Sequence, residues 1–381
     1  MPPSVPGSMV RYRQTLALSL FFKSYLSLSE SSSIDPREVS ATEVFHKDYL
    51  RGSQIYEIVP DDQKDYDPIR RPLKHSSAEK QASGEAVYVD DIPRLKDELF
   101  AGFVLSSKAH AKILNIDPSE ALSSKGVVGF FCHKDIQPEN NIYRMIYETD
   151  EWVFADGLVQ CVGQIIGIVV AKTQEQAQVA ADKVKIKYEE LKPIVTMDEA
   201  IQERSFLPLF GPRIKAAENI QQDLKSSDQV LKGELRSGAQ EHFYMEPQTC
   251  LAVPTKEDGE MIVYASTQNP TEAQRLVAHA LAVPMNRVVA RVKRVGGGFG
   301  GKETRCMPFI MAASFAAEKV QLPVRVCLDR DQDMLMSGQR HPFYSTYKVG
   351  FSKDGVVNAL DADLYCNAGY SLDLSFAVIH R

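Results

Sequence analysis

The sequence predicts an α+β fold, in which strands and helices follow one another without a strict repeat. Three observations lead to this prediction. The apolar run CVGQIIGIVVA has the length and composition of a buried strand, and a helix start at Thr173 follows it directly. A second helix start, Asn269–Pro270, comes after another strand-like run. Closer to the C-terminal end, Asp354–Gly355 has the composition of a hairpin turn between two strands.

Residues 84–195 are predicted to form the first globular domain, a small α+β unit. Thr173 and Gln176 have the spacing of a capping box at the start of its alanine-rich helix. The strands of this domain are expected in the runs FVLSS, AKILNID, GVVGFF, CVGQIIGIVVA and VKIKYEEL.

Residues 205–381 are predicted to form the second domain, with no element assigned in its charged first part, up to about residue 230. Strands are expected in FYMEPQTCLAV, MIVYAST, RVVARVKRV, PVRVCLDR and the two halves of YKVGFSKDGVVNALDADLYCNAG. One helix begins at Asn269 and ends before Pro284, with a buried face formed by Leu276, Val277, Ala280 and Leu281. The run PFIMAASFAAEK predicts a second helix.

The N-terminal part has a different character. Residues 1–30 contain the helix-like stretch MVRYRQTLALSLFFKSYLSLS, and residues 31–80 are polar and proline-rich, as in a linker. The apolar face of the helix consists of Leu16, Leu20, Tyr25 and Leu28, with no core of its own. A second apolar segment stops at Arg381, so we expect the chain to be a fragment of a longer protein.

Composition excludes several classes of partner. The net charge of −6 leaves no basic excess for binding nucleic acid. The run LALSLFF is too short to span a bilayer, so no membrane partner is expected. The six cysteines form no C-x-x-C pair and no evident disulfide framework, which argues against a local zinc or iron–sulfur motif and favours a reducing, cytoplasmic location.

The stretch RVGGGFGGKETR at 294–305 nearly fits two phosphate-binding templates. A P-loop needs Ser or Thr where Glu303 stands. A dinucleotide loop fits better, since Asp329 ends the next strand, but the charged pair Lys302–Glu303 is unusual where the helix must pack closely. A plain tight turn is the third possibility. Five glycines in six positions exceed what one turn needs, which indicates close approach of the backbone to a ligand.

Five motifs together identify a family. VGGGFGGKETR, STQNP, GEAVYVDDIP, QEHFYMEPQ and DRDQDMLMSGQRHP resemble the xanthine dehydrogenase and aldehyde oxidase family of molybdenum hydroxylases, from about Ala82 onward. The resemblance implies an α/β-hammerhead domain at 84–195, followed by the first part of a molybdopterin-binding domain. It also implies that FFKSYL is the end of a flavin domain.

The resemblance implies a molybdenum–molybdopterin cofactor, with two [2Fe–2S] clusters, FAD and NAD in a homodimeric parent protein. The parent is expected to oxidise hypoxanthine to xanthine and xanthine to urate, with NAD or oxygen as the final acceptor. No catalytic residue is expected within this chain, because the family's glutamate base would lie beyond Arg381. The chain alone is therefore expected to be inactive.

The site residues follow from the same resemblance. Gln268 corresponds to a glutamine beside the molybdenum oxygen ligands, and Phe299 and Gly300 to loop positions whose backbone faces the metal ligands; Gly298 is grouped with them as cofactor-binding. Taken alone, Gln268 would be a helix-capping residue and Phe299 a core residue.

Glu303 corresponds to the glutamate that binds purine in the xanthine dehydrogenase branch, where the aldehyde oxidase branch has a small or apolar residue. Three alternatives remain: an acid favoured by the helix dipole, a substrate range of aldehydes and N-heterocycles, or a non-catalytic truncated product. His242 and Glu246 could form a metal pair on one strand face, although a hydrogen-bonded structural His is the preferred interpretation. Arg340 and His341 are expected to serve packing or loop order.

Overall fold

The computed structural model describes most of the chain: residues 10–29, 33–43, 58–71, 73–146, 149–208, 218–255, 257 and 259–380. The outer ends of the predicted flavin-domain remnant (1–30), parts of the predicted linker (31–80) and residues 209–217 of the predicted second domain lie outside the described residues, as does Arg381. The chain divides into two compact units, 1–87 and 88–381, which are treated separately below. Among the described residues, no helix combines the length and apolar character that crossing a bilayer requires.

The first unit contains the 19-residue helix α1 (Val10–Leu28) and two short helical elements, η2 (Val39–Thr42) and α2 (Ala78–Ser83). The helix predicted near the N-terminus is present as α1. Its predicted apolar face is exposed within this chain, and Leu28 has the largest exposed fraction, at 89%. In α1 only Leu26 is buried.

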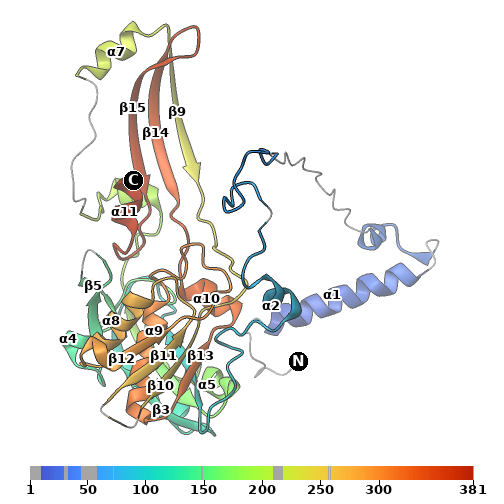
Figure 1. Ribbon diagram of the computed structural model, residues 1–381, viewed down its shortest axis with the longest axis vertical. Helices are drawn as coiled ribbons and strands as arrows, with labels where there is room; N and C mark the ends of the chain where they lie inside the picture. Colours follow the sequence, from blue (N-terminus) through green and yellow to red (C-terminus); the bar gives the residue numbers. More distant parts are fainter. Residues whose placement is uncertain are drawn as a thin grey trace. The chain divides into compact units, whose positions relative to one another are not determined.

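The second unit is organised by a seven-stranded sheet in the order β12-β11-β10-β13-β1-β7-β3 (Figure 1). Its strands are β1 (Leu99–Leu105), β3 (Val127–Cys132), β7 (Ile165–Ala171), β10 (Thr249–Pro254), β11 (Met261–Ala265), β12 (Val288–Arg291) and β13 (Val324–Cys327). Strand β1 pairs parallel to β13, with Leu99 opposite Val324. One sheet thus passes through both predicted domains, whose boundaries at 84, 195 and 205 stay predictions.

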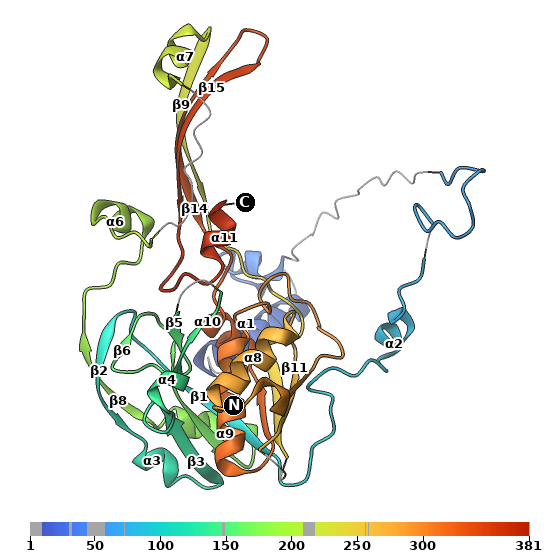
Figure 2. The same cartoon turned by 60° about the vertical axis from the view of Figure 1, so that its left-hand side comes forward.

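Helices cover both faces of this sheet. Gly102 of β1 lies against α5 (Gln174–Ala181), because a Cβ there would be 2.4 Å from the carbonyl oxygen of Ala177. The next residue, Phe103, contacts Phe309 of α9 (Met307–Val320) edge-to-face at 5.9 Å. Since neighbouring strand residues point to opposite faces, α5 and α9 cover opposite faces. Helix α8 (Pro270–Ala280) lies beside α9 (Figure 2).

Three smaller sheets complete the unit, in the orders β6-β2-β8, β4-β5 and β15-β14-β9. Their strands are β2 (Ala111–Asp117), β4 (Ile142–Arg144), β5 (Thr149–Trp152), β6 (Leu158–Val159), β8 (Lys185–Glu190), β9 (Gln229–Ser237), β14 (Phe343–Phe351) and β15 (Val357–Cys366). The other helical elements of this unit are short: α3 (Ser119–Leu122), α4 (Pro138–Asn141), α6 (Met197–Gln202), α7 (Ile220–Ser226), η3 (Met285–Arg287), α10 (Arg330–Met336) and α11 (Ser375–His380).

Local signals at helix starts and turns agree with the structure, except that the predicted capping box at Thr173 forms only in part: Gln176 Oε1 has no hydrogen-bond partner among the described residues. The Thr173 hydroxyl accepts a hydrogen bond from the Gln176 N–H at 3.2 Å, and Asn269 accepts one from Glu272 N–H at 3.3 Å. The predicted turn at Asp354–Gly355 joins β14 to β15, with Gly355 at φ +83°.

One prediction about a strand is wrong, and one strand was missed. The first part of FYMEPQTCLAV is irregular, because its polar side chains turn toward a neighbouring loop; β10 begins only at Thr249. Strand β9 occupies Gln229–Ser237, a segment to which no element was assigned from the sequence. It carries no alternating pattern because nearly all of its residues are exposed on both faces.

Candidate functional site

The glycine loop connects β12 to α9 and has an unusual backbone. Gly297, Phe299 and Gly300 all have positive φ, at +91°, +53° and +89°. Five of the eight N–H groups between Gly296 and Glu303 donate within the protein. Gly301 donates to the Gly298 carbonyl, Glu303 to the Gly300 carbonyl and Gly296 to Glu246, while Gly300 and Lys302 both donate to Gln268. A phosphate-binding loop must keep such donors free for its ligand. The structure therefore argues against both nucleotide interpretations.

Gln268 lies between β11 and α8, directly before the helix cap Asn269. Its side-chain Oε1 accepts hydrogen bonds from the N–H groups of Gly300 (3.1 Å) and Lys302 (3.2 Å). Its own N–H donates to the carbonyl of Lys302 at 2.8 Å. Two donors fix the oxygen end of the amide, so the Nε2 end is directed away from the loop as a free donor on an exposed residue.

Gly298 packs directly on this amide. A Cβ at position 298 would be 2.5 Å from Oε1 of Gln268, and no other residue type leaves that space open. The glycine is thus required by close approach of the backbone to Gln268.

Phe299 occupies the tip of the loop with 71% of its surface exposed. The interpretation of this residue as core-packing is wrong, because its left-handed backbone turns the ring outward. A bulky residue with positive φ is uncommon and costs about 1–2 kcal/mol. The loop is held in this conformation by contacts on its other side.

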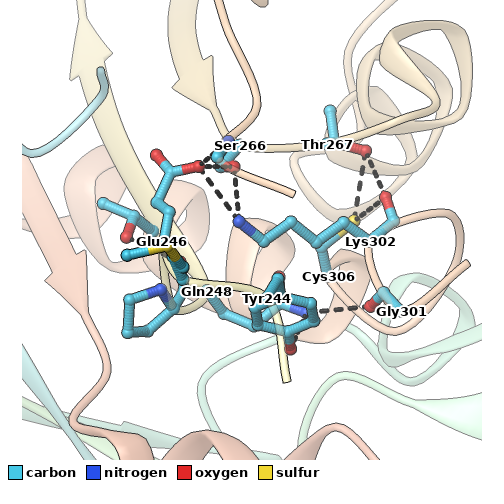
Figure 3. Close-up of polar contacts among 12 residues, drawn as sticks. Tyr244, Glu246, Gln248, Ser266, Thr267, Gly301, Lys302 and Cys306 are labelled. Atoms are coloured by element: carbon cyan, nitrogen blue, oxygen red, sulfur yellow. Dashed lines mark hydrogen bonds and ion pairs between the residues drawn. The ribbon is translucent and has the colours of Figure 1, made fainter. Parts of the chain in front are cut away.

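Those contacts centre on Lys302, whose side chain is fully buried. Its ammonium donates to Glu246 Oε2 at 3.0 Å and to Ser266 Oγ at 2.9 Å, and lies 4.6 Å from the centre of the Tyr244 ring (Figure 3). Burial lowers the pKa of Lys302, and the neighbouring Glu246 opposes that shift.

A second layer supports the same loop. Gln248 donates from Nε2 to the carbonyl of Gly301 at 2.9 Å and to the hydroxyl of Tyr244 at 3.0 Å. The Tyr244 hydroxyl in turn donates to Asp333 at 2.5 Å, and both Gln248 and Asp333 are buried. Sequence reasoning missed this set, although Tyr244, Gln248 and Asp333 all lie in motifs that it had singled out.

The proposed metal pair of His242 and Glu246 does not form. Glu246 is engaged by Lys302, and the His242 ring stacks on Tyr244 with centroids 6.3 Å apart. Burial lowers the pKa of His242. Its Nδ1 is buried without a hydrogen-bond partner among the described residues, so the hydrogen bond expected of a structural His is not made by that nitrogen. In the part of the chain that the structure describes, no three His, Cys, Asp or Glu residues are grouped as metal ligands.

Glu303 follows the loop and is partly exposed, with its side chain unbonded to any described residue. Helix α9 begins at Met307, and its first turn contains no acidic residue. The dipole acts within the first turn, so the interpretation of Glu303 as a helix-stabilising acid is not supported.

The residues after Glu303 anchor this corner to other parts of the fold. Arg305 donates to Glu151 of β5 at 2.6 Å and pairs with Asp373 at 3.2 Å. The Thr304 hydroxyl also donates to Asp373, at 3.1 Å. The part-buried His341 bonds Ser375 at 2.8 Å. Arg340 is exposed and donates to Gln240 at 2.9 Å, which agrees with the expected role in loop order but not in packing.

Comparison with known proteins gives the context for this loop. Residues 83–192 match the family description "aldehyde oxidase and xanthine dehydrogenase, a/b hammerhead domain", and residues 209–381 match "molybdopterin cofactor-binding domain". The chain belongs to the aldehyde oxidase and xanthine dehydrogenase family. The fold class predicted from the sequence, a hammerhead domain followed by a molybdopterin-binding domain, is confirmed.

The relatives in this family cover the whole chain. A xanthine dehydrogenase/oxidase from Gallus gallus is 50% identical over 100% of this chain, and a xanthine dehydrogenase from Drosophila subobscura is 46% identical over 99%. This chain spans 29% of the length of each.

Solved structures share the fold. Quinoline 2-oxidoreductase from Pseudomonas putida 86 has a TM-score of 0.69 at 24% identity, over 77% of this chain and 38% of that one. Reconstituted CO dehydrogenase from Oligotropha carboxidovorans has a TM-score of 0.69 at 25% identity, over 77% and 39%.

The loop fits a molybdopterin cofactor in its donor set. The Nε2 group of Gln268 and the N–H of Phe299 have no hydrogen-bond partner among the described residues, and both lie at exposed positions. Gly300, with open space where a Cβ would stand, lets a ligand approach the main chain. Neutral N–H donors of this kind suit oxygen ligands of a metal centre. The assignment of these positions remains a prediction.

Proposed function

We propose that this chain forms part of the substrate site of a molybdenum hydroxylase that oxidises hypoxanthine to xanthine and xanthine to urate. The observation that carries the proposal is the position of Glu303. Its carboxylate is partly buried and unbonded, and it directly follows the loop that Gln268 holds in place. The high identity to xanthine dehydrogenases supports the same function.

Each predicted site residue has a distinct part in this proposal. Gln268 would hold an oxygen ligand of the metal through Nε2, with the orientation of its amide fixed by the two bonds to Oε1. Phe299 would offer its main-chain N–H to the same ligands, Gly300 would leave open space for their approach, and Gly298 leaves room for the Gln268 amide. Oxygen transfer to carbon and uptake of two electrons are supplied by molybdenum–molybdopterin when it is bound.

Glu303 would select the substrate. A purine carries ring N–H groups that need acceptors once they are buried, and a carboxylate provides a charge-assisted one. A pocket without such a group discriminates strongly against the purine. In the whole protein we further propose two [2Fe–2S] clusters and FAD, with NAD or oxygen as the final acceptor, in a cytoplasmic homodimer. The six free cysteines suit a reducing compartment.

The test uses a chimera in which this chain replaces the matching segment of the Gallus gallus relative. We expect Glu303→Val to lower kcat/KM for hypoxanthine about 10–100-fold, the loss of one hydrogen bond to a charged group, and to leave kcat/KM for an aromatic aldehyde unchanged or higher. Glu318→Gln, at an exposed position on α9, is the matched control. Unchanged purine turnover in Glu303→Val would remove the proposal and favour an aldehyde oxidase.

A further inference from the structure

Lys302 is the point at which the glycine loop is attached to the core. Few lysines are fully buried, and a buried ammonium must be paired. Its partner Glu246 lies on the irregular segment before β10, and its second partner Ser266 follows β11. The side chain therefore crosses from the loop to two separate segments of the fold, as Figure 3 shows.

A single oxygen of Glu246 gathers three donors. Its Oε2 accepts from Lys302 Nζ at 3.0 Å, from Ser266 Oγ at 2.5 Å and from the Gly296 N–H at 2.7 Å. The Glu246 N–H also donates to the Gly296 carbonyl at 3.1 Å. Because Gly296 begins the loop and Lys302 ends it, one carboxylate ties both ends of the loop together.

The main chain of Lys302 makes a separate set of bonds. Its N–H donates to Gln268 Oε1, and its carbonyl accepts from the Gln268 N–H at 2.8 Å, from Thr267 Oγ1 at 3.0 Å and from Cys306 Sγ at 3.1 Å. A displacement of Lys302 would therefore move Gln268 as well as the neighbouring Glu303.

We propose that Lys302 is a positioning residue, whose buried ion pair with Glu246 fixes Gln268 and Glu303 relative to each other. The consequence for catalysis rests on the proposed function, whereas the consequence for the loop does not. If the ion pair only stabilised the fold, breaking it would lower the unfolding free energy of the whole chain and would not selectively loosen the glycine loop. The two cases are separated by a control pair of the same type.

That control is Arg325 with Glu98. Arg325 lies on β13 and Glu98 directly precedes β1. Both side chains are buried, with Nε and Oε1 2.7 Å apart, and among the described residues no hydrogen bond or ion pair joins either of them to the loop. The experiment compares Lys302→Met and the double variant Glu246→Gln/Lys302→Met with Arg325→Met and Glu98→Gln/Arg325→Met. Each double variant removes both charges and leaves no unpaired buried ion, so it keeps the fold where a single variant fails.

The first readout is hydrogen exchange of the 381-residue chain, followed by mass spectrometry. We expect the peptide covering 296–303 to exchange at least tenfold faster in Glu246→Gln/Lys302→Met than in the unmodified chain, with the peptide covering α9 unchanged. The control double variant should leave exchange of the loop peptide unchanged. Equal exchange of the loop peptide in the two double variants would overturn the proposal.

The second readout is activity in the chimera. Lys302→Met, or the double variant if the single one is unstable, should lower kcat about tenfold for an aromatic aldehyde, through the displaced Gln268, with its KM little changed. The loss of kcat/KM for hypoxanthine should be at least as large, because the purine also depends on the position of Glu303. A fall confined to the purine would contradict a positioning action through Gln268. If the chimera oxidised no purine at all, the proposed function would fail, and the exchange result would still decide the action of Lys302 on the loop.

Discussion

Gly298→Ala tests the packing of the loop on Gln268 at a single atom. The new Cβ would lie 2.5 Å from Oε1, 2.6 Å from Cδ and 3.0 Å from Cγ of Gln268, whereas ordinary contacts begin at 3.4 Å. The amide must move by about 1 Å, which breaks its bonds to the N–H groups of Gly300 and Lys302. At about 0.5–1.5 kcal/mol for each bond, and with a small gain from the reduced entropy of the unfolded chain, we expect a net loss of about 1–2 kcal/mol.

The assay is a double-mutant cycle on the unfolding free energy, measured with denaturant. Gln268→Ala removes the acceptor and also all three atoms that the new Cβ would meet. Gly298→Ala should therefore cost close to zero in the Gln268→Ala background. If the two losses simply add, the contact between Gly298 and Gln268 is not the cause and the reasoning fails.

A matched glycine separates steric overlap from backbone strain. Gly300 has φ +89° and nothing within 4 Å of the position that a Cβ would take, so Gly300→Ala should cost about 1–2 kcal/mol in any Gln268 background. Gly338, with φ +73° and the same open space outside the loop, gives the reference value for that strain.

Three further predictions use the same denaturation assay. Arg305→Met should lower the unfolding free energy by about 3–5 kcal/mol, because Glu151, with 1% of its side chain exposed, loses its ion-pair partner; a loss below about 1 kcal/mol would contradict this. Burial lowers the pKa of His341 below its usual 6.5. The contribution of this residue to the unfolding free energy is therefore present above pH 6.5 and is lost as the pH falls through the folded-state pKa. His341→Gln should flatten this fall of the unfolding free energy, by at most about 1.4 kcal/mol per pH unit. Phe299→Gly should change stability by less than about 1 kcal/mol, since the ring is exposed and the positive φ suits glycine; a loss above about 2 kcal/mol would show that the ring packs.

Features set by neighbouring residues could be predicted from the sequence. The helix starts at Thr173 and Asn269 and the turn at Asp354–Gly355 depend on contacts within a few residues, and all three agree with the structure. The glycine loop was recognised in the same way as an unusual backbone, with Gly297 and Gly300 at positive φ; its approach to a ligand stays a prediction. These signals are local because capping and turn formation are local.

Features set by distant residues could not be predicted from the pattern. A lysine is normally exposed, so nothing near Lys302 indicated that it is buried against Glu246, 56 positions away in the chain. The pairing of β1 with β13 joins Leu99 to Val324 and has no local signature. The position of Glu303 was predicted from the family motif, and its substrate contact stays a prediction.

The continuous sheet has a consequence for how such a protein can be divided. Strands β1 and β13 come from the two regions that the family descriptions treat separately, and they pair with each other through main-chain hydrogen bonds. A gene split between these regions would give two products with open main-chain donors and acceptors along a hydrophobic edge, which favours aggregation. The buried pair of Arg325 and Glu98 would also be parted, leaving an uncompensated ion on each side. The two regions are thus expected to be inherited, expressed and engineered as a single piece.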